Sequence, residues 1–215
     1  MTRADAHCGL PSDLLTPRLR LRAAGTDLAP AAAAFFERNR APHARWNPPP
    51  DESHFTVAGQ RALLDTAAQG MTGGSLASWW LLDRDAQVQA GECDVLGRVQ
   101  LTQIARGPFC SAMLGYAIDA AHEGRGLMRE ALQAVLADAF GRLGLHRVQA
   151  NVRPENERSL ALLARLGFER EGLAREYLFI DGAWRDHVMT ALRHPDWRAD
   201  QPPPRPAGAP VARPA

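Results

Sequence analysis

The segment Leu114-Gly-Tyr-Ala-Ile-Asp119, followed shortly by Glu123-Gly-Arg-Gly-Leu-Met128, decides the interpretation of this chain. The first part is typical of an apolar strand, and the second opens a long helix. Between them, Gly124 and Gly126 allow a sharp turn and a close approach to a ligand, because glycine has no Cβ. Their N–H groups then point outward at a helix N-terminus, where the dipole also favours an anion. The junction predicts a pyrophosphate site, to which Arg125 adds a charge.

Other readings of this glycine pattern are open from the residues alone. A plain turn that caps the helix explains Gly124 and Gly126 equally well. The segment is not a Walker loop, because the GKS/T ending is missing. It is also not the dinucleotide fingerprint GxGxxG, because Arg129 stands where the third glycine would be.

Outward from this junction, the periodicity of apolar residues predicts a single α/β domain. The expected strands are Leu19–Arg22, Trp79–Leu82, Leu96–Ile104, Leu114–Asp119, His146–Val152, Tyr177–Ile180 and Trp184–Leu192. The expected helices are Thr26–Arg40, Ser53–Gln69, Leu127–Leu143 and Asn156–Leu166. Asp181-Gly182 is a strong signal for a two-residue hairpin. This order predicts a mixed sheet of six or seven strands with helices on both faces.

Composition sets the bounds of this domain. The chain has 215 residues, 46% of them hydrophobic, which is enough for one domain with its own core. We expect the domain to occupy residues 14–197, after a flexible N-terminus at residues 1–13. The Pro- and Ala-rich residues 198–215 predict a disordered tail, because repeated prolines lack backbone donors and fix φ.

Charge and cysteine content limit the partners and the compartment. The net charge of +1 gives no reason to expect bulk binding to DNA or to a membrane. No apolar run reaches the ~18–20 residues that span a bilayer, so we expect a cytoplasmic protein. Cys8, Cys93 and Cys110 lie at wide, irregular spacing, which argues against a disulfide framework and a structural zinc site. We expect no metal, and either a monomer or a homodimer.

Three segments together resemble a known family. The opening segment is similar to motif A of the GNAT acetyltransferases, and Asn156-Glu-Arg-Ser159 with Leu166-Gly-Phe168 resembles the next signature of that superfamily. Asp181-Gly-Ala-Trp-Arg-Asp-His-Val188 closely resembles the RimJ branch, the bacterial ribosomal-protein-alanine N-acetyltransferases. Further similarity to this branch lies at Thr16-Pro-Arg-Leu-Arg-Leu-Arg22, Trp46 and Asp51-Glu-Ser-His-Phe55. The likeness runs from Leu15 to Trp197.

This resemblance implies a GNAT fold, a mostly antiparallel mixed sheet with a V-shaped splay beside the strand that ends at Asp119. The pantetheine arm of acetyl-CoA, the expected cosubstrate, would lie in the V and bond to backbone as an added strand does. The implied cofactor-binding residues are Leu114, Tyr116, Ala117, Ile118, Glu123, Gly124, Arg125, Gly126, Leu127, Met128, Asn156 and Ser159. One departure is Glu123, because many family members carry Arg or Gln there.

Amide formation needs a base for the attacking amine and a proton for the departing CoA thiolate. By analogy with the family, Ser159 is the expected partner of the thiolate, and Asn156 lies three residues before it at a helix start. Asn156 also suits the simpler role of an N-cap. Glu176 is the expected base, with Asp119, Glu92 or a water chain as rivals.

The acceptor side is predicted less directly. Trp46, beside three prolines, is expected to wall the acceptor pocket together with Asp119, although Trp46 would suit plain loop packing equally well. Asp186 and His187 are expected to fix each other and the final hairpin, with acid–base catalysis as a less favoured role.

Three functions compete at this point. The leading prediction is acetyl transfer from acetyl-CoA to the N-terminal α-amine of a protein, a ribosomal protein that starts with Ala. The second is a GNAT enzyme for a small amine, such as an antibiotic or polyamine. The third is a non-catalytic acyl-CoA sensor or assembly protein, for which the acidic Glu123 is the one supporting feature.

Overall fold

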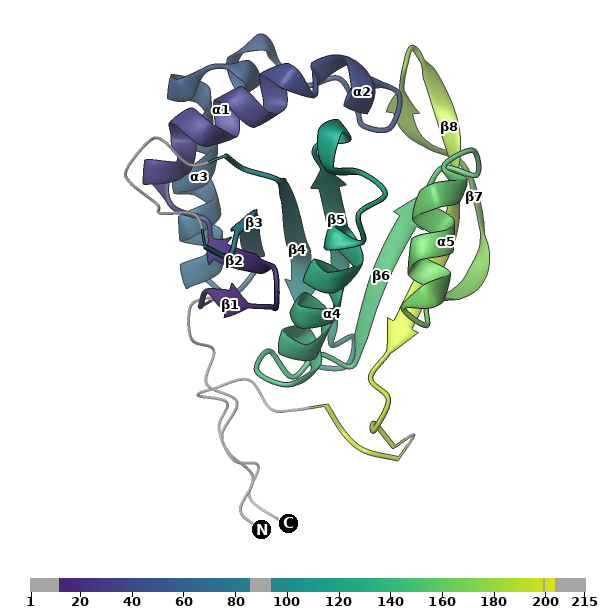
Figure 1. Ribbon diagram of the computed structural model, residues 1–215. Helices are drawn as coiled ribbons and strands as arrows, with labels where there is room; N and C mark the ends of the chain where they lie inside the picture. The colour runs from purple at the N-terminus through teal and green to yellow at the C-terminus, as the bar shows by residue number, and fades with distance from the viewer. Residues whose placement is uncertain (1–11, 86–93, 199, 204–215) are drawn as a thin grey trace.

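One eight-stranded sheet organises the molecule (Figure 1). The computed structural model describes residues 12–85, 94–198 and 200–203. Within these ranges the strand order is β1-β2-β3-β4-β5-β6-β8-β7, and β5–β6 is the one parallel pair among these neighbours. The strands are β1 Leu14–Leu15, β2 Leu19–Ala23, β3 Ala77–Asp83, β4 Gly97–Ala105, β5 Ser111–Ile118, β6 Arg147–Val152, β7 Glu169–Ile180 and β8 Ala183–Arg193. The predicted mixed, mostly antiparallel α/β fold is confirmed.

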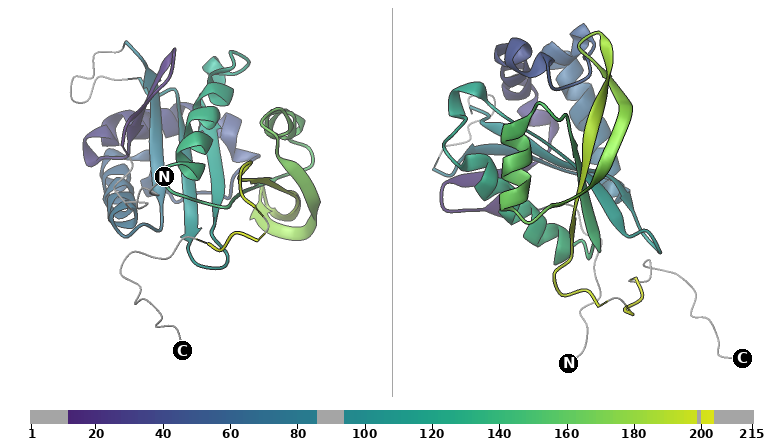
Figure 2. Two further views of the ribbon diagram at one scale, coloured as in Figure 1. Left: turned by 90° about the horizontal axis from the view of Figure 1, so that it is seen from below. Right: turned by 90° about the vertical axis from the view of Figure 1, so that its right-hand side faces the viewer.

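Helices cover both faces of this sheet, as predicted (Figure 2). Their bounds are α1 Ala29–Arg38, α2 Arg40–Ala44, α3 Val57–Thr72, α4 Leu127–Phe140 and α5 Glu157–Arg165, with short 3-10 turns η1 Thr26–Leu28, η2 Glu52–Phe55 and η3 Ala120–His122. The larger core lies between the sheet and α4 and α5, where Leu132, Val135 and Leu163 are almost fully buried. The smaller core lies under α1 and α3 around Phe35 and Trp80.

The helix predicted over Thr26–Arg40 is divided in the structure. A 3-10 turn comes first, α1 ends at Arg38, and α2 starts again at Arg40. Asn39 between them is 1% exposed, and its side chain donates to the Phe35 carbonyl and accepts from the Ala120 N–H. The buried Asn39 side chain thus ties this point of the chain to the end of β5. The helix is interrupted here, and α2 turns away from α1 toward the middle of the sheet.

A splay between β5 and β6 opens the middle of the sheet, as the family resemblance implied. The two strands pair only from Ser111–Met113 to Arg147–Gln149. Beyond these residues, Leu114–Ile118 stays paired with β4 but not with β6. The remaining parts of β5 and β6 therefore form the two walls of a V.

The last hairpin is longer than predicted. Its turn at Asp181-Gly182 has two positive φ angles, 52° and 69°, which confirms the two-residue turn. β7, however, already begins at Glu169, and a bulge with Glu176 at φ 48° interrupts it between Ala174 and Leu178. Most of this edge strand is exposed, so it carries no alternating apolar signal.

Several predictions concern residues outside the described ranges, the remaining cysteine, and membrane or metal sites. The expected flexible N-terminus and disordered tail fall mostly outside the described residues, as do Cys8, Glu92 and Cys93. Cys110 is buried and unpaired. Within the described ranges no helix is both long and apolar enough to cross a bilayer, and no cluster of three His, Cys, Asp or Glu side chains is arranged to hold a metal ion.

Candidate active site

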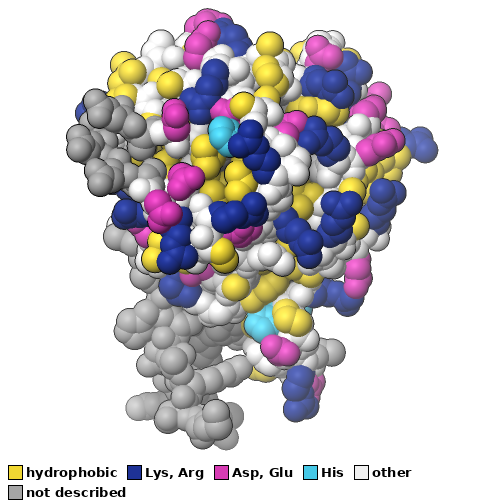
Figure 3. Space-filling model, viewed as in Figure 1, with side chains coloured by type: hydrophobic (Ala, Val, Ile, Leu, Met, Phe, Trp, Pro, Cys, Tyr) yellow, Lys and Arg dark blue, Asp and Glu magenta, His cyan; other side chains and the backbone are white. Residues whose placement is uncertain are grey.

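A cleft of about 1100 Å³ lies at the splay between β5 and β6. Arginine side chains gather around its position on the face seen in Figure 3. The described residues that line it come from six regions. These are 41–43 and 45–47 at α2, 114–118 on β5, 120, 122–124 and 126–129 at the start of α4, 150–153 on β6 and the loop after it, 156, 158, 159, 161, 162 and 165 on α5, and His187 on β8.

The glycine segment before α4 presents free backbone donors to this cleft. Gly124 and Gly126 have φ of 75° and 76°, which explains the need for glycine. Within the described part of the chain, the N–H groups of residues 124–128 donate to no backbone or side-chain acceptor. Gly126 caps α4 without a side-chain hydrogen bond, so the helix N-terminus stays open to an anion.

A polar cluster holds the glycine segment in place. Glu130, in the first turn of α4, accepts from the Thr16 hydroxyl at 2.6 Å and from the Arg18 N–H and Nε at 2.8 and 2.7 Å. Arg18 also donates to the Arg125 carbonyl at 3.0 Å. These hydrogen bonds lower the pKa of the Glu130 carboxyl against the opposing effect of burial. The Arg125 side chain itself is not among the lining residues, and its expected contact with a phosphate stays a prediction.

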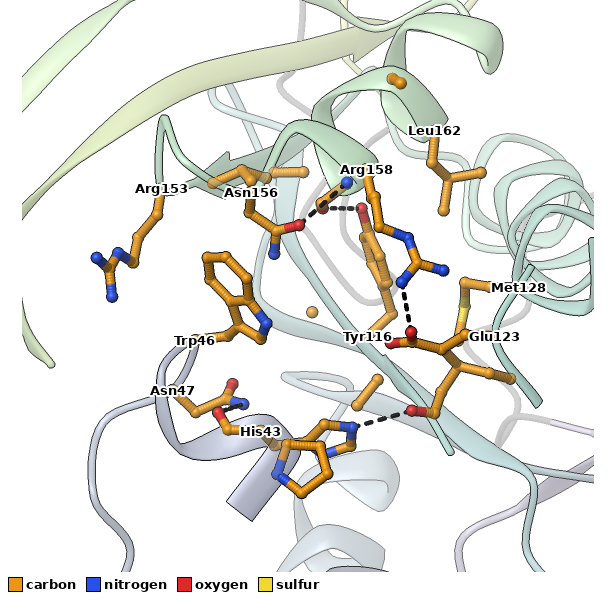
Figure 4. A pocket seen from close by; sticks show the side chains of 18 of the residues that line it. His43, Trp46, Asn47, Tyr116, Glu123, Met128, Arg153, Asn156, Arg158 and Leu162 are labelled. Atoms are coloured by element: carbon orange, nitrogen blue, oxygen red, sulfur yellow. Dashed lines mark hydrogen bonds and ion pairs between the residues drawn. The ribbon is translucent and has the colours of Figure 1, made fainter. Parts of the chain in front are cut away.

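The acidic residue of the segment has its own partner. Glu123 forms an ion pair with Arg158, which comes from α5 on the other wall of the cleft (Figure 4). Both side chains are partly exposed. Arg158 therefore offsets the charge of Glu123 beside the glycine segment.

Two hydroxyl groups meet across the V. Tyr116 on β5 and Ser159 on α5 are joined by a hydrogen bond of 2.6 Å between their oxygens. Burial raises the pKa of the Tyr116 phenol to about 12, so this group stays protonated at neutral pH. One of the two O–H groups donates within the pair, which leaves the other proton free to donate to a third atom. The arrangement can therefore protonate a leaving group in the cleft.

Asn156 caps α5, which was the simpler of the two roles that the sequence left open. Its Oδ1 accepts from the Ser159 N–H at 3.2 Å, so it is the N-cap of α5. It also lines the cleft. The cap fixes the first turn of α5 and directs its N-terminus toward the cleft, where the helix dipole favours a developing negative charge.

α2 and the residues after it cover the far end of the V. Trp46 lies between Asn156 and Arg153 on one side and Asn47 on the other, as Figure 4 shows, and it lines the cleft. The guanidinium groups of Arg45 and Arg153 lie 4.0 and 5.7 Å from the centre of its ring. His43 Nε2 donates to the Ile118 carbonyl at 2.9 Å and ties α2 to β5.

Asp119 does not occupy the position that the sequence predicted for it. It is 4% exposed, is absent from the cleft lining, and accepts from Arg38, from Asn39 at 3.3 Å and from the Ala121 N–H at 2.9 Å. These donors lower its pKa despite burial, so the carboxylate stays ionised and fully engaged. Asp119 joins α1 to the end of β5 and is available neither to an acceptor nor as a base.

Glu176 also lies away from the cleft lining. It is an exposed residue in the β7 bulge, where its N–H donates to Asp186 Oδ1 at 2.9 Å. Asp186 thus closes the bulge and makes no hydrogen bond to His187, contrary to the expectation that these two fix each other. Glu92, the other proposed rival, lies outside the described residues.

The structure adds site residues that the sequence analysis did not single out. Asn151 and Arg153 line the cleft from β6 and the loop after it, and Arg158 lines it from α5. The available signal was their spacing, because Asn151 and Arg153 alternate with the buried Val152 at the end of a strand. Such alternation shows that they share a face, but it does not show that a cleft lies there.

Comparison with known proteins assigns the family. A family model described as an acetyltransferase (GNAT) domain matches residues 18–169, so the chain belongs to the GNAT acetyltransferases, which are acetyl-CoA-dependent acyltransferases. Within this family the chain is similar to the [ribosomal protein uS5]-alanine N-acetyltransferase of Escherichia coli (strain K12). The two are 41% identical over 184 residues, 86% of this chain and 92% of that protein. The predicted family and its RimJ branch are confirmed.

Solved structures agree with this assignment. The ribosomal-protein-S5-alanine acetyltransferase from Vibrio fischeri superposes with a TM-score of 0.80 and 31% identity, covering 86% of this chain and 98% of that one. The RimJ of Mycobacterium smegmatis, in complex with CoA-disulfide, gives a TM-score of 0.77 and 27% identity over 87% and 88% of the two chains.

The residues of this cleft fit the cosubstrate of the family. Open N–H groups at residues 124–128 suit a pyrophosphate, and a Cβ at Gly124 would point into open space rather than into protein. The described lining carries the arginines Arg45, Arg129, Arg153, Arg158 and Arg165 against a single carboxylate, Glu123. This excess of positive charge suits the phosphates of CoA.

Proposed function

We propose that this protein transfers an acetyl group from acetyl-CoA to the N-terminal α-amine of ribosomal protein uS5, at an alanine. The observation that carries this proposal is the 41% identity to the E. coli uS5-alanine enzyme over 92% of that protein's length. The geometry of the cleft supports the same reaction, because its two ends differ in chemistry. Open backbone donors lie at one end, and aromatic and polar side chains lie at the other.

The residues act in a defined order along the cleft. Backbone N–H groups of residues 124–128 bind the pyrophosphate, and the unpaired part of β5 lies beside the pantetheine arm. Acetyl-CoA supplies the activated thioester. The hydroxyl pair of Tyr116 and Ser159 donates a proton to the departing sulfur, and the N-terminus of α5 stabilises its negative charge. Trp46 forms a wall for the acceptor.

A peptide panel with acetyl-CoA, followed by mass spectrometry, tests this proposal. The peptides are the N-terminal segment of uS5 with a free α-amine, the same peptide blocked at that amine, and the same peptide with a different first residue. We expect one acetyl group on the first peptide alone, located on the α-amine by fragmentation. Because the enzyme contains no lysine, its own side-chain amines cannot take the label.

The same panel separates the alternatives. Transfer to a polyamine or aminoglycoside, with no transfer to any peptide, would replace the proposed acceptor by a small amine. Tight CoA binding without turnover on any amine would identify a sensor.

A further inference from the structure

His187 is a buried histidine whose tautomer is fixed by its surroundings. It lies on β8, is 3% exposed, and its Nδ1 is 3.1 Å from the Arg185 carbonyl oxygen. A carbonyl can only accept, so Nδ1 carries the proton. In the neutral ring, Nε2 then has a lone pair and acts as an acceptor.

This lone pair has no partner within the described residues. His187 lines the cleft. Besides the Nδ1 hydrogen bond, its ring packs against the Tyr177 ring, with 5.1 Å between the two ring centres. Nε2 forms no hydrogen bond to the described residues and is not a fully buried atom. A ring nitrogen held in one tautomer and open to a cleft is available to a bound donor.

A second unused acceptor lies on the same face of the sheet. In the β6–β8 register Asn151 faces Met189, and His187 lies two residues along β8, so both side chains leave the sheet on one side. Asn151 Nδ2 donates to the Tyr177 hydroxyl at 2.9 Å, while its Oδ1 is buried without a partner among the described residues. Both residues contact Tyr177, so two acceptors without donors lie beside one side chain. Buried acceptors of this kind normally have a hydrogen-bond donor.

We propose that His187 Nε2 is the base that takes a proton from the α-ammonium group of the acceptor, and that Asn151 Oδ1 binds the same nitrogen. This inference rests on the proposed acetyl transfer to an amine. Glu176, the base expected from the sequence, is exposed in the β7 bulge, and its rival Asp119 is engaged by hydrogen-bond donors.

The charges around His187 determine its protonation state. Burial lowers the pKa of His187 below its usual 6.5, and the Arg153 guanidinium lowers it further. The Arg185 carbonyl and the carboxylates of Glu155 and Asp186 act in the opposite direction. Because burial is the largest of these effects, the ring is neutral at neutral pH and can accept a proton.

The proton transfers balance without another reactant. Nε2 takes one proton from the ammonium group, and the neutral amine attacks the thioester carbon. The C–S bond then breaks, and the Tyr116–Ser159 pair gives a proton to the departing sulfur. The nitrogen loses its second proton to solvent, and the hydroxyl pair takes one proton back from solvent. His187 finally releases its proton to solvent. The products are the amide, CoA thiol and one proton.

A weak base of this kind also favours an α-amine over a lysine side chain. The α-amine has a pKa of about 7.7–8.0 and the lysine amine about 10.4, a difference of about 2.5 units. Deprotonating lysine is therefore less favourable by a factor of a few hundred. The proposed base thus predicts selectivity for the chain terminus.

The test is the pH dependence of kcat/KM for the uS5 peptide, in wild type and in His187→Gln. In wild type, log(kcat/KM) should level off near neutral pH, because His187 is already deprotonated. In His187→Gln it should keep rising to about pH 8, the pKa of the free α-amine. We expect a loss of about 100-fold near pH 7 that shrinks to about 10-fold above pH 9, in the range of general base catalysis.

The controls separate this role from folding. His146→Gln makes the same change at a histidine whose pKa is also lowered by burial, outside the cleft lining, and should keep the wild-type profile. Acetyl-CoA affinity should be unchanged in both variants. If His187→Gln fails to bind acetyl-CoA, His187→Ala with added imidazole replaces it, and recovery of turnover is expected.

The outcomes distinguish the two proposals. Wild type that acetylates the peptide, with His187→Gln showing the wild-type rate and pH profile, would overturn the role of His187 alone. The same conclusion follows if imidazole leaves His187→Ala inactive. Wild type that acetylates another amine but not the peptide would overturn the acceptor assignment, and His187 would then be tested with that amine. Absence of transfer to any amine would overturn both.

Discussion

The two ends that we propose for the cleft, one for phosphate and one for the acceptor, are built from different parts of the chain. The phosphate end uses backbone N–H groups from one short segment, residues 124–128, held by Glu130 and Arg18. The acceptor end uses side chains from segments far apart in sequence, among them Trp46, Asn151 and His187. Binding by backbone N–H groups depends on the conformation of the segment. Binding by side chains depends on the identity of each residue.

This difference explains the departure at Glu123. Backbone donors do not change when a neighbouring side chain changes, and Arg158 pairs with the acidic group that this chain carries. The cosubstrate end can therefore vary in its side chains and keep its function. At the acceptor end a single substitution should remove a specific contact.

The largest effect is expected where the two ends meet, at the Tyr116–Ser159 hydroxyl pair. Ser159→Ala should lower kcat by about 100-fold, because the departing sulfur loses its proton donor. The affinity for acetyl-CoA, measured by calorimetry, should stay within about twofold, because the phosphate end is unchanged.

Tyr116→Phe and the double variant complete this test. If the two hydroxyls act as one unit, the double variant should be no slower than the slower single variant. Turnover in Ser159→Ala equal to that of wild type would remove Ser159 from the chemistry.

An intermediate effect is expected at Gly115 on β5. Its φ is not in the left-handed region, it lines the cleft, and a Cβ there would have no protein atom within 4 Å. Valine suits a strand, so Gly115→Val should leave the thermal stability close to that of wild type. Its methyl groups would project into the cleft, and we expect at least about a 10-fold loss in kcat/KM for the peptide, the effect of roughly 1.4 kcal/mol.

Gly172→Val is the matched control. Gly172 also lies in a strand without positive φ and without protein within 4 Å of its Cβ position, but outside the cleft lining. It should keep wild-type kinetics. Equal losses of kcat/KM in the two variants would show that the Gly115 effect is not steric blocking of the cleft.

The smallest effect is expected at Glu123. Glu123→Gln removes a negative charge next to the phosphate loop and frees Arg158, so acetyl-CoA should bind about two- to threefold more tightly, since exposed ion pairs contribute little. The turnover number should not change. Glu169→Gln, which breaks the exposed pair with Arg193 elsewhere, is the control. Weaker binding in Glu123→Gln would instead mean that Glu123 holds Arg158 in the position that binds phosphate.

The local backbone structure at the proposed phosphate end could be predicted from the sequence, because it depends on short-range contacts. Positive φ at Gly124 and Gly126, the open helix start and the cap at Asn156 all follow from short-range chemistry. The sheet with helices on both faces followed from apolar periodicity for the same reason. The missed elements were β1, which has two residues, and the exposed first part of β7, which lacks an apolar pattern.

The acceptor end could not be predicted in the same way. Asp119 and Glu176 were chosen because they end a strand and precede a hairpin, but tertiary contacts decide their environment. Arg38 and Asn39, some eighty positions away in the sequence, engage Asp119, and a bulge moves Glu176 out of the cleft lining. The same long-range contacts bring Trp46 and His187 to one cleft.

In this proposal, the two ends of one cleft meet at the gap between β5 and β6. A crystal structure with a bisubstrate inhibitor, in which the α-nitrogen of the uS5 peptide is joined through an acetyl group to the sulfur of CoA, tests it most directly. We predict the pyrophosphate on residues 124–128, the sulfur beside Ser159, and the peptide nitrogen within hydrogen-bond distance of His187 Nε2. A peptide that leaves the cleft by another route, with its nitrogen away from His187 and Trp46, would contradict the proposed meeting of the two ends.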